Sequence, residues 1–408
     1  MRKTVFSRAA VAVLLGAACL ALTACGGGGG GSSPANAATA ATSPTTPPVT
    51  PSSQLANQIP VTIEQNPGET GFVTSNTPYV TVTVCDSSGN CVNVDHVLVD
   101  TMSSGFRVFS SALGSLNLAT PTGAAATAET ECSYFGSGYT WGSVRLATVK
   151  MAGEAATNIP VQVVTDPSLT SVTDPCTGSG SYNYDSAQAL GSNGILGVAP
   201  FLADEQAYYN CNSGTCSTIT VAQEVGNPVA QFASDNNGVI LSLPAQTAQA
   251  STTSGVLTFG IDTQADNSQA GYTLVSMSYN GEMTAAFNGG TYPQSIVDSG
   301  SNMNYLYMPN EPTLTQGGIT WINPPQTIPV ALNLSGGGAG SYTTNVTLTP
   351  AANYAFSPQP VSPYMAVSSQ TTTMQDFGLP FFYGHPVAVT FSGKVTHEGT
   401  GPQIGFGS

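Results

Sequence analysis

One pattern of residues occurs twice in this chain, far apart in the sequence. It reads VLVDTMSSG around Asp100 and SIVDSGSNM around Asp298. In both copies apolar residues lead into the aspartate, a hydroxyl residue follows it, and another hydroxyl residue stands two positions further on. Each copy is followed later by apolar residues and a glycine, at Ile195–Leu196–Gly197 and at Phe377–Gly378. This internal repeat predicts two homologous lobes, each presenting one carboxylate.

Short β-branched segments dominate the rest of the chain. PYVTVTVC, CVNVDHVLVD, IPVQVVTD, GVILSLP and HPVAVTF are each bounded by Gly, Pro, Asn or Asp, as strands are. No segment keeps a helical apolar period over four turns, and the best short helix candidate begins at Asn227. Residues Tyr79 to Val99 predict a hairpin that delivers Asp100 to the end of a strand. We therefore expect an all-β fold with minor helix.

The first residues resemble an export signal. Three basic residues precede an apolar run, Ala9–Ala24, which ends in LTAC at Cys25. This arrangement resembles a bacterial lipobox, which implies cleavage before Cys25 and a diacylglycerol on its sulfur. An ordinary cleaved signal with an incidental cysteine is the alternative. Because Gly26 rather than an aspartate follows, the resemblance implies an outer-membrane lipoprotein that faces the periplasm or the cell surface.

Composition divides the remaining chain and limits its partners. Residues 26–57 are mainly Gly, Ala, Ser, Thr and Pro, a composition that cannot bury a core and predicts a flexible tether. We expect an N-terminal β lobe at 58–245 and a C-terminal β lobe at 246–408. The chain holds 7 Lys+Arg against 22 Asp+Glu, so it lacks the basic footprint of a nucleic-acid binder. We expect a monomer anchored to the membrane by its lipid.

The cysteines predict disulfides. Two of the eight, Cys19 and Cys25, fall in the leader. An even set remains, which indicates disulfides in an oxidising compartment, and pairing between sequence neighbours is the simplest of the 15 connectivities. Zinc is the alternative, but no Cys-x-x-Cys occurs and the three histidines are scattered. We expect no metal and no cofactor. The six cysteines are Cys85, Cys91, Cys132, Cys176, Cys211 and Cys216.

The duplicated turns resemble those of the pepsin-like aspartic peptidases. The likeness extends to SYFGSGYTWGSVRLATVKMAG, which is similar to the family's flap hairpin, and to NGILGVAPF, GVLTFGIDTQADNSQAGYTLVSM and FGLPFFYGHPVAVTF. These segments follow the family's order over most of residues 77–408. The resemblance implies a bilobal double β-barrel with a central cleft. The lipobox, tether and paired cysteines also resemble a group of uncharacterised Gram-negative lipoproteins, filed as a domain of unknown function.

The resemblance to the peptidases implies a role for each residue of the repeated turns. Asp100 and Asp298 would form a dyad that shares one proton and activates a water molecule. Thr101 and Ser299 would lock the two loops together, and Ser103 and Ser301 would hold the outer carboxylate oxygens. Tyr134 would be the tyrosine of the flap, with Phe135 and Tyr139 as alternatives.

Met102 departs from the family pattern, which has a glycine there. We expect the methionine to shift or strain the loop and so to weaken the dyad, with Met102→Gly raising activity. Two functions fit this sequence. One is an acid-acting endopeptidase that needs no cofactor. The other is a catalytically impaired binding module, or pseudoenzyme, whose cleft holds an extended peptide or a glycan without cutting it.

Overall fold

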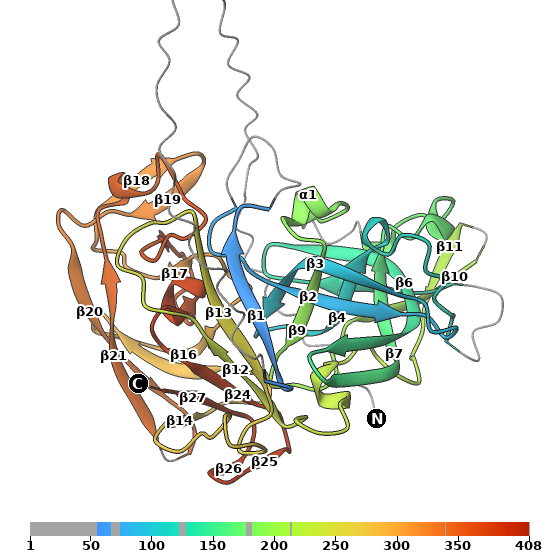
Figure 1. Cartoon of the computed structure of the whole chain (residues 1–408). Helices are drawn as coiled ribbons and strands as arrows, with labels where there is room; N and C mark the ends of the chain where they lie inside the picture. Colours follow the sequence, from blue (N-terminus) through green and yellow to red (C-terminus); the bar gives the residue numbers. More distant parts are fainter. Residues whose placement is uncertain are drawn as a thin grey trace, which may run out of the picture.

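The computed structural model describes residues 55–66, 74–121, 128–176, 182–212, 214–338 and 340–407. The predicted signal, Cys25 and nearly all of the tether lie outside these residues. Within them, strands provide almost all of the regular structure, so the all-β prediction is confirmed. No described helix is both long enough and apolar enough to span a membrane. Figure 1 shows the two lobes, one blue to green and the other orange, with β12, β13 and β24 between them.

The first lobe is built from strands that belong to one large sheet. Its hairpin β2–β3 pairs Cys85 with Cys91 at the turn, as predicted, and Val80, Val82 and Val84 of β2 are buried. The strands are β1 (Gln58–Glu64), β2 (Pro78–Cys85), β3 (Cys91–Asp100), β4 (Ser104–Phe109), β5 (Ala128–Tyr134), β6 (Gly138–Met151), β7 (Glu154–Val164), β8 (Tyr182–Asn183), β9 (Gly194–Val198), β10 (Ala207–Asn212) and β11 (Thr215–Thr218).

The same sheet continues into strands that join the lobes. β1 pairs with β13, and the order then runs β13–β12–β24–β27–β14, so the backbone hydrogen bonding passes from the N-terminal to the C-terminal part of the chain. The boundary expected at residue 245 falls in the connection between β12 and β13. These strands are β12 (Gly238–Ser242), β13 (Thr252–Phe259), β14 (Thr273–Ser276), β24 (Val387–Thr390) and β27 (Gln403–Phe406).

The second lobe is built around a nine-stranded sheet. Its strands are β15 (Met283–Phe287), β16 (Gly290–Val297), β17 (Asn304–Leu306), β18 (Thr313–Gln316), β19 (Ile319–Ile322), β20 (Ile328–Ser335), β21 (Ser341–Leu348), β22 (Ala366–Ser368) and β23 (Asp376–Phe377). A separate small hairpin consists of β25 (Val395–Thr396) and β26 (Gly399–Thr400).

In the part of the chain that the structure describes, helix is confined to short pieces. The single-turn helix α1 (Ala187–Leu190) begins after Ser186, whose hydroxyl accepts a hydrogen bond from the Ala189 N–H. The helix expected from Asn227 is wrong: that segment forms only a 3₁₀ turn at Val229–Gln231. Further 3₁₀ turns within the described residues include Ser110–Ala112, Pro167–Leu169, Ala351–Asn353 and Leu379–Phe382.

The two lobes repeat one strand arrangement around the two aspartates. In the first lobe β9 lies parallel to β3 and antiparallel to β4. In the second lobe β23 lies parallel to β16 and antiparallel to β17. Gly197 of β9 lies against Ser103, and Gly378 lies against Ser301, with no room for a Cβ in either place. This bilobal, internally repeated architecture is the pepsin-like fold class that the sequence predicted.

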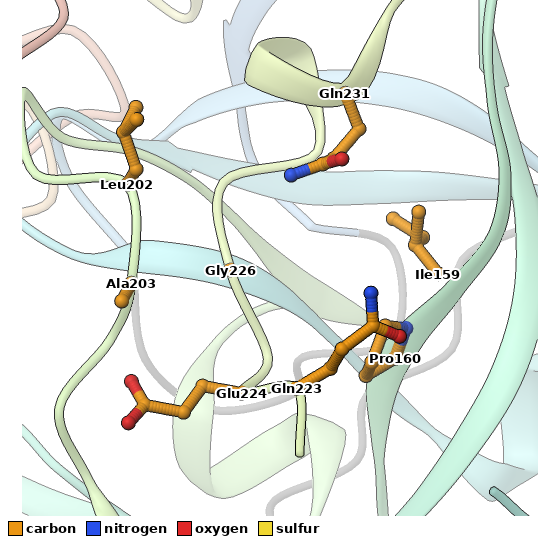
Figure 2. A pocket seen from close by; sticks show the side chains of 8 residues that line it. All are labelled: Ile159, Pro160, Leu202, Ala203, Gln223, Glu224, Gly226 and Gln231. Carbon is orange, nitrogen blue, oxygen red and sulfur yellow. The ribbon is translucent and has the colours of Figure 1, made fainter. Parts of the chain in front are cut away.

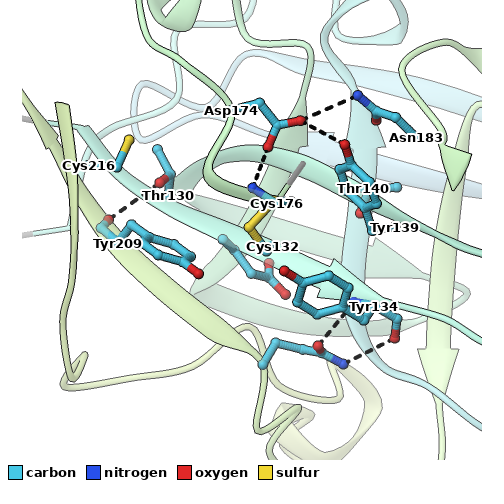
Figure 3. The surroundings of a disulfide bond; sticks show 12 residues. Thr130, Cys132, Tyr134, Tyr139, Thr140, Asp174, Cys176, Asn183, Tyr209 and Cys216 are labelled. Carbon is cyan, nitrogen blue, oxygen red and sulfur yellow. Dashed lines mark hydrogen bonds between the residues drawn. A yellow bond between two sulfur atoms is a disulfide. The ribbon is translucent and has the colours of Figure 1, made fainter. Parts of the chain in front are cut away.

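Three disulfides occur within the described residues, and they confirm the pairing of sequence neighbours. Cys85–Cys91 closes the β2–β3 turn, and Cys211–Cys216 joins the paired strands β10 and β11. Cys132–Cys176 ties β5 to the segment that follows β7. Figure 3 shows this bond at the centre of a cluster of tyrosines.

Candidate active site

Asp100 lies at the end of β3, where the strand turns into the first repeated loop. Its Oδ1 accepts hydrogen bonds from the backbone N–H of Met102 at 2.8 Å and of Ser103 at 3.1 Å. Its Oδ2 accepts from the Ser103 hydroxyl at 2.6 Å. Three hydrogen-bond donors therefore fix the position of this carboxyl group.

Asp298 follows β16 in the equivalent position and receives fewer donors. Its Oδ1 accepts from the Gly300 N–H at 2.8 Å, and its Oδ2 is 3.0 Å from the Ser301 hydroxyl. Burial, the negative charge of Asp100 and the charge of Asp376 raise the pKa of Asp298 well above its ordinary value. These surroundings favour the protonated form of Asp298.

Thr101 and Ser299 lock the two loops to each other. The Thr101 N–H donates to the Ser299 hydroxyl at 3.1 Å, and the Ser299 N–H donates to the Thr101 hydroxyl at 2.9 Å. Each hydroxyl then donates across the lobe interface, Thr101 to the Val297 carbonyl and Ser299 to the Val99 carbonyl. Both side chains are buried, so these bonds are shielded from water.

The two loops approach closely enough for one to touch the other's carboxylate. A Cβ added to Gly300 would lie 2.7 Å from Cγ of Asp100. Such a contact is far inside van der Waals distance, so any side chain at position 300 would displace the Asp100 carboxyl group. The structure thus brings together the six site residues predicted in the repeated turns: Asp100, Thr101, Ser103, Asp298, Ser299 and Ser301.

Met102 does not distort this arrangement, contrary to our expectation. Its N–H bond to Asp100 has the same 2.8 Å length as the Gly300 bond to Asp298. Its backbone is not in the positive-φ region, so the position does not require glycine. The thioether extends to the other lobe, where a Cβ on Gly281 would lie 3.1 Å from Met102 Cε and 3.2 Å from Pro200 Cγ. The methionine therefore packs between the lobes.

The predicted flap is the hairpin β5–β6, whose turn is closed by a bond from the Phe135 N–H to the Gly138 carbonyl. Tyr134 packs beside Tyr139 near the Cys132–Cys176 disulfide, as Figure 3 shows. Burial and the neighbouring Tyr209 and Asp174 raise its pKa. These contacts place the Tyr134 side chain in the tyrosine cluster, and its closing over the dyad stays a prediction.

The two alternative flap residues, Tyr139 and Phe135, also contact other side chains. Tyr139 is buried and its hydroxyl donates to Asp174 at 3.0 Å. The Phe135 ring lies 5.8 Å from the Arg107 guanidinium. Arg107 itself is buried and pairs with Glu131 at 2.7 Å and Asp204 at 2.8 Å.

Sequence reasoning missed a third carboxyl group in the site. Asp376 begins β23 and accepts a hydrogen bond from the Ser301 hydroxyl at 2.7 Å. The signal was present in the repeat, because the first copy reads Ile-Leu-Gly at 195–197 where the second reads Asp-Phe-Gly. Tyr305 of β17 was missed as well. Burial and the charges of Asp376 and Asp298 raise its pKa.

Other candidate sites lie away from these residues. A cavity of about 230 Å³ in the first lobe is lined by Pro160, Leu202 and Glu224 among others, and no residue of the repeated turns lines it (Figure 2). Among the described residues, one cluster has metal-ligand spacing: Cys132, Asp174 and Cys176. Its two sulfur atoms are joined in a disulfide, so they do not offer thiolate ligands.

The fold and the locked pair of aspartate turns define a two-lobed, pepsin-like chain. The family model described as "Protein of unknown function (DUF3443)" matches residues 53–406, and the chain belongs to that family. Among solved structures, the chain is similar to an aspartic proteinase from Irpex lacteus. The two share 15% identity and a TM-score of 0.47 over 86% of this chain and 96% of the other. No curated protein matches the sequence.

Proposed function

We propose that this chain is an aspartic endopeptidase that hydrolyses extended peptides at acid pH without a cofactor. The observation that carries the proposal is the asymmetry of the locked carboxyl pair. Asp100 accepts three hydrogen bonds, while burial and negative neighbours raise the pKa of Asp298 well above its ordinary value. In this proposal Asp100 acts as the base and Asp298 as the acid, which are the two groups that this chemistry requires.

In the proposed reaction, Asp100 takes a proton from a water molecule whose oxygen attacks the peptide carbonyl carbon. Asp298 gives its proton to the carbonyl oxygen, so a neutral gem-diol forms. Asp100 then passes its proton to the leaving nitrogen as the C–N bond breaks, and a diol hydroxyl returns a proton to Asp298. The pair ends in its starting protonation state. The role of Thr101 and Ser299 is to keep the two loops fixed during these transfers.

We further propose that Cys25 carries a lipid that anchors a monomeric chain to the outer membrane, facing the periplasm or the cell surface. Support comes from the sequence, because the apolar run ends in LTAC. Cys25→Ser should abolish the membrane fractionation of the mature protein. Normal processing and unchanged fractionation of this variant would contradict the anchor.

The peptidase proposal is tested with a fluorescently labelled, unstructured protein substrate between about pH 3 and 6, the range of a carboxyl dyad. Asp100→Asn and Asp298→Asn should each lower kcat/KM by at least about 100-fold. Asp235→Asn is the matched control, because Asp235 is buried but accepts hydrogen bonds from Thr263 and Gln264, in the loop between β13 and β14.

The binding-module alternative predicts a different result from the same experiment. If folded wild type cuts nothing at any pH, the peptidase proposal fails. Retention of the uncut substrate would then favour a module that binds extended peptides. A glycan ligand would be indicated if only a glycan array gave binding.

A further inference from the structure

A single serine hydroxyl connects two carboxyl groups in the site. Ser301 Oγ lies 3.0 Å from Asp298 Oδ2 and 2.7 Å from Asp376 Oδ2. The two carboxyl oxygens are therefore no more than about 5.7 Å apart. A hydroxyl group has one hydrogen to donate. If Ser301 donates to one carboxylate, the other contact is favourable only when the second carboxyl group carries a proton and donates it to Ser301.

The surroundings of Asp376 favour that proton. The side chain is 7% exposed, and its buried Oδ1 has no hydrogen-bond partner among the described residues. An ionised oxygen in such a place is costly. Burial raises the pKa of Asp376 to about 7, with the Ser301 hydrogen bond opposing the rise and the Asp100 charge adding to it.

Three titratable groups interact electrostatically with Asp376. They are Asp100 at the end of β3, Asp298 after β16, and Tyr305 of β17, which pairs directly with Asp376. The pKa of Tyr305 is raised, so this phenol stays neutral across the acid and neutral range. Within the described part of the chain, no ion pair to Asp376 is found. Only other carboxyl groups, therefore, contribute charge around it.

The fold itself does not require a carboxyl group at this position. In the parallel pairing, Asp376 stands opposite Ile296, two residues before Asp298. The equivalent residue in the first lobe is Ile195, which stands opposite Leu98, two residues before Asp100. Ile195 is buried and apolar. An apolar residue thus satisfies the same strand arrangement, and Asp376 adds a charge to one side of the pair.

We propose that Asp376 is a positioning residue that shares a proton with Asp298 through Ser301, so that its charge keeps Asp298 protonated at less acid pH. The catalytic consequence rests on the proposed peptidase function, whereas the proton sharing does not. As pH rises, Asp376 ionises, and its negative charge opposes the loss of the proton from Asp298. The working range of the dyad is thereby extended toward neutral pH.

The first test is the pH profile of kcat/KM for the full chain with the labelled substrate. Asp376→Asn keeps the shape and a hydrogen-bonding side chain but removes the charge. In the pH profile of this variant, the fall in kcat/KM on the alkaline side should move to lower pH by about one to two units. That is the size of a charge interaction at this separation. Asp235→Asn should leave this fall in place. A profile of Asp376→Asn that coincides with wild type would overturn the proposal, because a merely structural serine–aspartate bond leaves the fall where it is.

The second test needs no activity. Asp376 has a folded-state pKa above its unfolded value, so the folded chain retains a proton that the unfolded chain releases. The Asp376 side chain therefore lowers the free energy of unfolding as pH rises from about 4 to about 7. The unfolding midpoint of Asp376→Asn should rise relative to wild type across that window, and that of Asp235→Asn should not. A pH-independent difference for Asp376→Asn would overturn proton sharing even if wild type proves to be no peptidase. Conversely, if wild type is inactive but shows the expected pH dependence of stability, only the peptidase function is contradicted and the proton sharing stands.

Discussion

The sequence and the structure predict different effects of Met102→Gly on activity. From the family pattern, glycine should restore a damaged loop and raise activity. The structure predicts otherwise, because Met102 already donates to Asp100 at 2.8 Å without a positive φ. A tenfold gain would require about 1.4 kcal/mol of new transition-state stabilisation. The hydrogen bonds to Asp100 offer no source for it, so we expect kcat/KM to change by less than about threefold.

Met102→Gly should instead cost stability. Truncating a fully buried methionine costs about 2–5 kcal/mol. Met102 is partly exposed and its thioether lies beside Gly281, so the lower end applies. Glycine adds about 0.5–1 kcal/mol of backbone entropy. We expect the free energy of unfolding to fall by about 2–3 kcal/mol in urea titrations, with Met102→Leu as a volume-conserving control. A tenfold or larger rise in kcat/KM with unchanged stability would refute this reasoning.

Two further predictions concern buried groups that hold the first lobe together. Cys132→Ala/Cys176→Ala removes a bridge across 44 residues of sequence separation, and loop-closure entropy predicts a loss of about 4 kcal/mol in the free energy of unfolding. Urea titration of oxidised wild type and the double variant measures the loss, and unchanged midpoints would contradict it. Arg107→Met leaves Glu131 and Asp204 buried without their counter-charge and should cost about 3–5 kcal/mol at neutral pH. A loss below about 1 kcal/mol by the same titration would show that the pair contributes little.

Local patterns were enough to predict much of the fold. Alternating β-branched residues mark the strands, and the turn between Cys85 and Cys91 fixes its own hairpin register. The repeated turns locate both aspartates because each one is encoded by a contiguous segment. The disulfide pairing could also be predicted from local sequence, because two of the three disulfides close loops of only a few residues.

What sequence reasoning missed depends on contacts between distant segments. Asp376 reaches the site only because β23 lies parallel to β16, and no local period marks that pairing. The helix expected at Asn227 ends after one 3₁₀ turn because the chain extends at Phe232. The ring of Phe232 lies 5.3 Å from that of Phe259 in the core. Core packing thus overrides the local helix signal.

The most direct test of the proposed dyad is to measure the binding of a statine-type mimic of the gem-diol by isothermal titration calorimetry near pH 4.5. This measurement does not depend on knowing the preferred substrate sequence. Wild type should bind, and Asp298→Asn should bind at least about 100-fold more weakly, because such mimics gain affinity from groups arranged for the transition state. Equal affinity for wild type and Asp298→Asn, or no binding by folded wild type, would contradict the account.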